Sequence, residues 1–238
     1  MVAHGLLSRK AWLAPLLAGG VLVAGVLAGC GSLAAPGSSS GSESAGRVIS
    51  RMHSAIAAAH SVRVTGHMKQ GSTTVTLAVS FAGRQMAGMI GDNGASFAVV
   101  TASGQAYIKL DAAFLAMVHL PASDCSSICG RWIELTATGA KPLTGGVSMA
   151  GLIDRAYDSP LVRRARASGA VFVPATADGR AVLQYRKDGY TLDVARTGPA
   201  YPVLFTGPDG VRIVFSDWNR VRLPAPPAAS QVVNLSRL

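Results

Sequence analysis

Residues 61–82 read SVRVTGHMKQGSTTVTLAVSFA, and this stretch decides the fold class of the chain. Apolar and polar residues alternate along both halves of the stretch, and a Gln-Gly-Ser turn signal lies between the halves at residues 70–72. A period of two is typical of β-strands that bury one face, and two such strands joined by a short turn predict an antiparallel hairpin. The apolar positions of the second strand are Val75, Leu77, Val79 and Phe81.

The same pattern continues outward from this hairpin. It predicts strands at residues 85–90, 95–101, 105–110 and 131–136, and again at 170–174, 181–186, 190–195, 202–206 and 211–218. Apolar residues at helical spacing predict a helix at 47–60 and further helices within 144–168. This order of elements predicts an α+β fold, with one large antiparallel sheet and helices on one face. So many strands in one sheet must curl strongly or close.

The N-terminal segment predicts the location of the protein. Arg9 and Lys10 precede an apolar run at residues 11–28, which is the layout of a secretory signal peptide. The run ends in LAGC at residues 27–30, which resembles a bacterial lipobox. In that motif the cysteine thiol is lipidated, and the signal peptide is then cleaved just before the cysteine. We therefore expect an acylated Cys30 that anchors the protein to the outer face of the cell membrane. An ordinary signal peptide and an uncleaved anchor remain as alternatives.

This interpretation divides the chain into three parts. Residues 1–29 form the lipoprotein signal peptide, residues 30–46 comprise the acylated Cys30 and a flexible Gly/Ser-rich linker, and residues 47–238 form one domain. The linker can bury no apolar surface, so we expect it to tether the domain near the membrane and leave it free to tumble.

The composition excludes several classes of protein. The chain of 238 residues is 49% hydrophobic and 14% charged, and its formal net charge is +10. This hydrophobic content argues against disorder along the whole chain. Only one stretch approaches the length of a bilayer span, which argues against a multi-span membrane protein. For an exported lipoprotein, the positive charge favours a membrane surface as partner, and we expect no nucleic acid.

Several segments resemble a known family by their order along the chain. They are SVRVTG at residues 61–66, QAYIK at 105–109, GRWI at 130–133, YTLDV at 190–194, RTGP at 196–199 and VFSDW at 214–218. In this order they resemble the actinobacterial lipoproteins of the LppX/LprG type, within the wider LolA/LolB-like superfamily. The resemblance implies a U-shaped half-barrel with helices on its concave face. In several family members a hydrophobic cavity between sheet and helices holds acyl chains.

The resemblance makes the apolar strand and helix positions candidates for lining such a cavity. They are Met52, Ile56, Val75, Leu77, Val79, Phe81, Ile108, Leu152, Ile153, Leu192, Val194, Ile213 and Phe215. The alternative is that these side chains simply form a solid core, because a cavity and a core use the same residue types. The run LVRRAR at residues 161–166 places Arg163, Arg164 and Arg166 as candidates for contact with lipid headgroups or the membrane, against the alternative of a solvated helix face.

Other chemistry receives little support. Cys125 and Cys129 are expected to form a disulfide, since two cysteines in a short loop outside the cytoplasm commonly do so. Residues 146–151 (GVSMAG) miss the G-x-S-x-G pattern of serine hydrolases by one position. Carboxylates and histidines are scattered, so we expect no catalytic residue, no metal and no cofactor.

The sequence therefore predicts a monomeric, non-enzymatic envelope lipoprotein that binds or carries a lipid, a lipoglycan or another amphiphile in a half-barrel pocket. The alternative is an envelope scaffold lipoprotein, which binds another protein and takes no small-molecule ligand.

Overall fold

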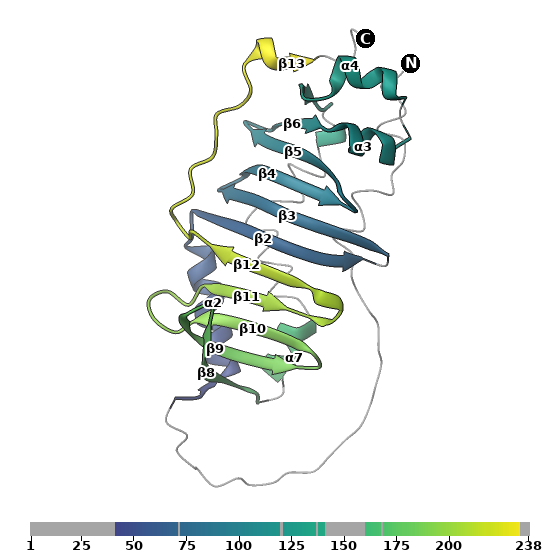
Figure 1. Ribbon diagram of the computed structural model, residues 1–238. Helices are drawn as coiled ribbons and strands as arrows, with labels where there is room; N and C mark the ends of the chain where they lie inside the picture. Colours follow the sequence, from purple (N-terminus) through teal and green to yellow (C-terminus); the bar gives the residue numbers. More distant parts are fainter. Residues whose placement is uncertain are drawn as a thin grey trace.

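The computed structural model describes residues 41–70, 72–119, 121–136, 138–140, 160–167 and 169–233 (Figure 1). The predicted signal peptide, Cys30 and most of the predicted linker lie outside the described residues. The strands are β1 (Glu43–Ser44), β2 (Ser61–Gln70), β3 (Thr73–Ala82), β4 (Gln85–Asp92), β5 (Ala95–Ala102), β6 (Gln105–Leu110), β7 (Trp132–Glu134), β8 (Val171–Ala177), β9 (Arg180–Lys187), β10 (Tyr190–Ala195), β11 (Pro202–Thr206), β12 (Arg212–Ser216) and β13 (Val232–Val233). The α-helices are α2 (Ala45–Ala57), α3 (Ala112–Met117), α4 (Cys125–Ile128) and α7 (Pro160–Ala167), and the 3₁₀ turns are η2 (Ala122–Asp124), η3 (Pro208–Gly210) and η4 (Ala229–Gln231).

The strands form a single sheet of 13 strands in the order β1-β8-β9-β10-β11-β12-β2-β3-β4-β5-β6-β7-β13. Strands β2 to β7 form one meander and strands β8 to β12 form another, and pairing of β12 with β2 joins the two. All pairs are antiparallel except β13 with β7. The predicted large, mostly antiparallel sheet is therefore confirmed.

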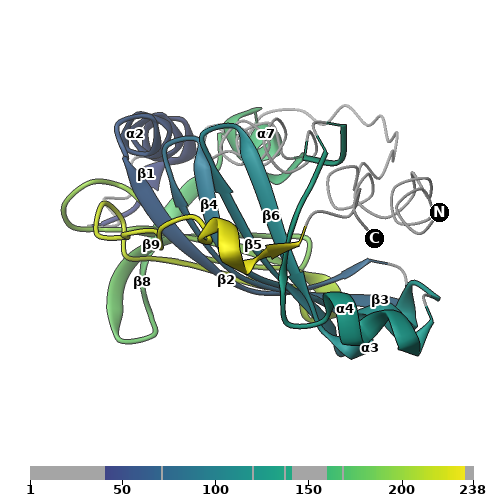
Figure 2. The same ribbon diagram turned by 90° about the horizontal axis from the view of Figure 1, so that it is seen from above.

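Helix α2 lies on one face of the sheet because its apolar residues form a stripe. Its buried side chains recur every three or four positions, which places them along one side of the helix, and they are Ala45, Val48, Ile49, Met52 and Ile56. Helix α7 lies beside α2 on the same side of the sheet (Figure 2). We call the face that these helices cover the inner face. Within the described residues, none of the helices has the length and apolar character needed to cross a bilayer.

A second set of short helices packs at the opposite end of the sheet. Leu115 of α3 and Ile128 of α4 are buried together with Leu110 of β6 and Ile133 of β7. Phe114 of α3 makes an edge-to-face contact with Phe97 of β5, with 5.2 Å between the ring centroids. Cross-strand register places Phe97 and Leu110 on the inner face, so helices cover that face at both ends of the sheet.

The ends of the sheet differ from the expectations in two places. Strand β1 pairs with Val171 and Phe172 of β8, although residues 43–44 fall within the predicted linker. The C-terminal segment runs along the strand ends before it adds β13 beside β7 (Figure 1). Both strands have two residues, which is too short for a period-two pattern to be detected.

We expect the apolar stripe of α2 to be essential for stability. Ile49→Ala removes a side chain that is 1% exposed, and truncations of this kind cost about 2–5 kcal/mol. The neighbouring exposed residue provides the control, because Ser50→Ala should change stability by less than about 0.5 kcal/mol. Urea unfolding of the full chain measures both values, and equal stabilities for the two variants would contradict this role for α2.

Candidate functional site

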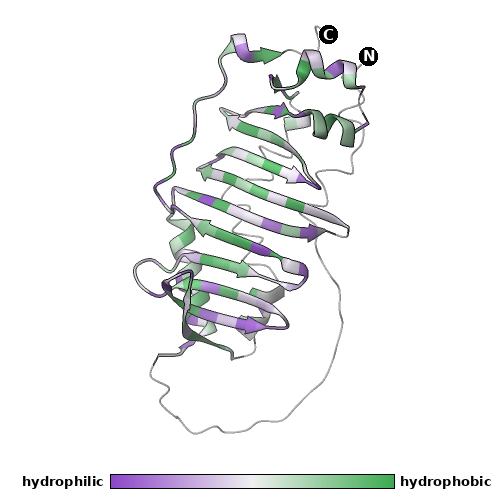
Figure 3. Ribbon diagram, viewed as in Figure 1, coloured by the Kyte–Doolittle hydropathy of each residue, from purple (hydrophilic) through white to green (hydrophobic). Residues whose placement is uncertain are grey.

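The inner face carries two large apolar clusters, and Figure 3 shows apolar and polar residues alternating along the strands that build them. The first, the helix-covered cluster, joins α2 and α7 to β8, β9 and β10. The second, the central cluster, spreads over β2 to β6 and β12. Phe205 of β11 and Trp218, just after β12, pack against both clusters. The apolar inner face is therefore continuous across the join between the two meanders.

The sequence-predicted cavity residues are divided between these clusters. Met52, Ile56, Leu192 and Val194 lie in the helix-covered cluster. The other described members of the set lie in the central cluster and are Val75, Leu77, Val79, Phe81, Ile108, Ile213 and Phe215. Leu152 and Ile153 lie outside the described residues. All described members thus face the same side of the sheet, in two neighbouring groups.

The central strands keep part of their apolar surface accessible. Leu77, Phe97 and Ile108 are half-buried, whereas Met52 and Val194 in the helix-covered cluster are almost completely buried. Leu77 pairs with Ile90, and Ile90 pairs with Phe97, so these side chains form a row across β3, β4 and β5. An apolar ligand on the inner face would find its accessible contacts along this row.

Two glycines lie close to this row, one in β4 and one in the adjacent strand β2. Gly66 of β2 and Gly88 of β4 have φ values of 150° and 154°, which side chains disfavour. A Cβ atom at Gly66 would collide with the carbonyl oxygen of Arg212, and one at Gly88 would collide with that of Ala78. Both positions therefore require glycine for a close approach of neighbouring strands.

The predicted basic run lies on α7. Val162 and Ala165 are buried in the helix-covered cluster, and the side chains of Arg163 and Arg166 are exposed. Arg164 lies on the same helix, but its side chain is outside the described set. The helix thus turns an apolar side to the sheet and presents arginines to solvent.

The predicted disulfide is confirmed. Cys125 and Cys129 are bonded across the single turn of α4, with 4.7 Å between their Cα atoms. Both half-buried cysteines pack against the cluster formed by Leu110, Leu115, Ile128 and Ile133. The bond therefore holds α4 closed where the chain passes from β6 to β7.

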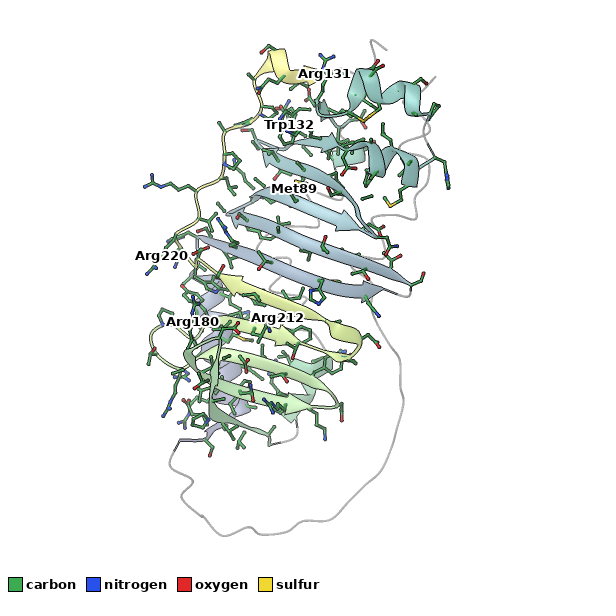
Figure 4. All side chains as sticks on the ribbon, viewed as in Figure 1. Met89, Arg131, Trp132, Arg180, Arg212 and Arg220 are labelled. Atoms are coloured by element: carbon green, nitrogen blue, oxygen red, sulfur yellow. A yellow bond between two sulfur atoms is a disulfide. The ribbon has the colours of Figure 1, made fainter. Side chains whose placement is uncertain are left out.

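Sequence reasoning missed a surface cleft of about 550 Å³ at the ends of β9, β10 and β12. Its walls include Arg180, Thr197, Tyr201, Trp218 and Arg220. Figure 4 shows Arg180 and Arg220 on the same side of the sheet, where the C-terminal segment leaves β12. Aromatic and arginine residues gather in the sequence at 196–201 and 218–222, but nothing in their spacing indicates that these segments meet.

The aromatic wall of this cleft is held in place by several contacts. The Tyr201 and Trp218 rings stack with 4.4 Å between their centroids and 5° between their planes. The Trp218 indole N–H donates to the carbonyl of Pro202 at 3.2 Å, and Asn219 Nδ2 donates to the Tyr201 hydroxyl at 2.9 Å. Asn219 Oδ1 also accepts from the backbone N–H of His60. The wall is therefore fixed before any ligand arrives.

A carboxylate is buried on the opposite, outer face of the sheet. Asp193 is 1% exposed and lies between Leu192 and Val194, which point to the inner face. Gln184 Nε2 donates to Asp193 Oδ1 at 2.7 Å. Burial raises the pKa of the Asp193 carboxyl above its ordinary value of 3.8, and the Gln184 hydrogen bond and the Arg186 charge partly oppose this rise.

The outer face is also crossed by an ion pair. Arg212 Nη2 of β12 donates to Asp178 Oδ2 at 2.9 Å, although Asp178 lies in the turn between β8 and β9. Ala177, Val182, Val203 and Leu204 form a small apolar cluster beside this contact. The β8–β9 turn therefore reaches across the outer face to the start of β12.

The described residues contain no group of three or more His, Cys, Asp or Glu side chains that could hold a metal ion. The GVSMAG segment at 146–151 lies outside them.

The fold of this chain is similar to that of a solved structure. No protein-family model matches the sequence, and no curated protein matches it. Among solved structures, the fold is similar to the crystal structure of LprF from Mycobacterium bovis, with a TM-score of 0.50 and 14% sequence identity. The match covers 77% of this chain and 97% of that chain. The resemblance to the LppX/LprG type that the sequence predicts is thus confirmed in the fold.

We expect Asp193 to make stability depend on pH. Since the folded protein holds the Asp193 proton more tightly than the unfolded chain, stability falls as pH rises from about 3.8 through the raised pKa. Asp193→Asn keeps an oxygen acceptor for Gln184 and removes this dependence. We expect its melting temperature at pH 7 to exceed that of the wild type by about 2–4 °C, which corresponds to about 1 kcal/mol.

Thermal unfolding followed by circular dichroism at pH 7 and at pH 3 measures this difference, which should shrink at the lower pH. Asp209→Asn removes an exposed carboxyl and is the matched control. A lower melting temperature for Asp193→Asn at pH 7 would mean that the ionised carboxylate stabilises the fold.

Proposed function

We propose that this protein is a non-enzymatic cell-envelope lipoprotein that carries a lipid, lipoglycan or other amphiphile on the inner face of its sheet. The observation that carries the proposal is the continuous apolar inner face, which keeps Leu77, Phe97 and Ile108 half-buried between helices at both ends. Burying acyl chains there removes apolar surface from water at about 25 cal/mol per Å². The likeness to the LprF fold supports this proposal.

The carrier would use the sheet as a curled, U-shaped half-barrel with its helices on the concave face. Two interior glycines support the curl. Gly88 lets β4 approach β3 closely, and Gly66 does the same for β2 and β12. Interior glycines commonly mark bends in strands.

The anchor would be the N-terminal cysteine of the mature chain. In this proposal, the signal peptide of residues 1–29 is removed, Cys30 carries the lipid, and residues 31–42 link it to β1. A flexible linker of this length has a mean reach of about 20 Å, so the monomeric domain stays close to the outer face of the membrane. Arg163, Arg164 and Arg166 on α7 are the proposed contacts with anionic headgroups, each contributing about 1 kcal/mol near such a surface.

The proposal predicts that lipid co-purifies with the full chain and is detected by mass spectrometry after organic extraction. Leu77→Glu places a carboxylate in the accessible apolar row and should reduce the bound lipid at least tenfold, because burying an unpaired charge among acyl chains is costly. Thr76→Glu is the matched control, since Thr76 is exposed on the outer face of the same strand.

Circular dichroism shows whether each variant is folded, and Leu77→Ala provides a milder change that should reduce lipid content without adding charge. A wild-type protein free of lipid, which also fails to take up a fluorescent fatty acid, would overturn the carrier function. That result together with a protein partner captured from membranes would favour the alternative scaffold function.

A further inference from the structure

We propose that the surface cleft at the ends of β9, β10 and β12 is a binding site for a phosphate ester. This site is separate from the inner-face row, and it does not depend on the protein being a lipid carrier. The cleft of about 550 Å³ falls within the range of about 300–1,000 Å³ that is common for small-molecule sites. It is therefore large enough for a phosphate group and one attached sugar or polyol.

The charges of the cleft select an anion. Arg180 and Arg220 both line it, and among the described residues neither guanidinium has an ion-pair partner. The carboxylate in the lining is that of Asp217, and Arg63 offsets its charge at 3.3 Å. The site thus keeps two uncompensated positive charges that face a common space.

The type of cation further restricts the ligand. Guanidinium groups present a planar fork of donors that matches the oxygens of a phosphate, and they bind phosphate and carboxylate in paired hydrogen bonds. Two guanidiniums at one cleft can together contact more oxygens than a single carboxylate offers. A phosphate ester meets this donor set better than a simple carboxylic acid does.

The remaining wall suits the organic part of such a ligand. The stacked Tyr201 and Trp218 rings give a rigid apolar surface, and the Thr197 side chain lies in the same lining. Backbone contacts also fix the segment that carries Arg220: its N–H donates to the carbonyl of Asp217 at 3.0 Å, and the Asn219 N–H donates to that of Ser61 at 2.9 Å. The backbone and the aromatic rings therefore need little further ordering on binding, which leaves mainly the arginine side chains to be ordered by the ligand.

Isothermal titration of the full chain with glycerophosphoinositol tests the proposal, with myo-inositol as the uncharged comparison. We expect the phosphodiester to bind, inositol to bind at least tenfold more weakly, and the affinity for the phosphodiester to fall as salt increases. The double variant Arg180→Gln/Arg220→Gln should bind the phosphodiester at least tenfold more weakly than the wild type. The control variant Arg84→Gln/Arg131→Gln removes the same charge at exposed positions outside the cleft and should bind as the wild type does.

Sedimentation with vesicles of phosphatidylcholine and phosphatidylinositol distinguishes a lipid headgroup from a free phosphate ester as the source. Binding of the soluble phosphodiester that is lost only in the cleft variant supports a free ester as ligand. Binding to vesicles alone, again lost only in the cleft variant, supports a lipid headgroup. No binding in either assay, or equal losses in the cleft and control variants, would overturn the site. The lipid content of the purified wild type is a separate measurement, so the two proposals can fail independently.

Discussion

Pairing of β12 with β2 is the interaction on which the rest of the structure depends. It joins a strand near the C-terminus to one near the N-terminus, and so turns two meanders into one sheet. Gly66 lies in this seam opposite Ile213, where a Cβ atom would collide with the carbonyl oxygen of Arg212. The seam therefore needs both the backbone ladder and the absence of a side chain at one position. Formation of this pairing brings residues about 150 positions apart into contact. The loss of chain entropy that this requires occurs once for the whole inner face.

The seam also creates both candidate sites. On the inner face it places Ile213 and Phe215 beside Val64 and Val79, so the central and helix-covered clusters become one apolar surface. At the strand ends it brings the turn after β12 against Ser61 and the aromatic side chains against one another. Trp218 takes part in both, because its ring packs on the apolar clusters and also lines the cleft.

Much of this arrangement was predictable from the sequence, for reasons that particular residues make plain. Alternation at Val75, Leu77, Val79 and Phe81 identified a buried strand face, because the period of two in a strand is a local property. The pairing of β12 with β2 and the lining of the cleft depend on contacts between distant segments, which no local pattern encodes. Asp193 was missed for the same reason. Within YTLDV it takes the outward position, which normally faces solvent, and only tertiary contacts bury it.

The same limit explains why core and cavity could not be separated by residue type. Leu77 and Val79 lie on one strand, face one side and have similar chemistry, yet Val79 is almost completely buried and Leu77 is half-buried. Their cross-strand neighbours do not separate them either, because Val79 pairs with Val64 and Gly88, and Leu77 pairs with Gly66 and Ile90. Gly88 lets β4 approach β3 closely, since a Cβ atom there would collide with the carbonyl oxygen of Ala78. An alanine at Gly88 would therefore act on the shape of the apolar face through the backbone of β3, without changing a single apolar side chain in the row.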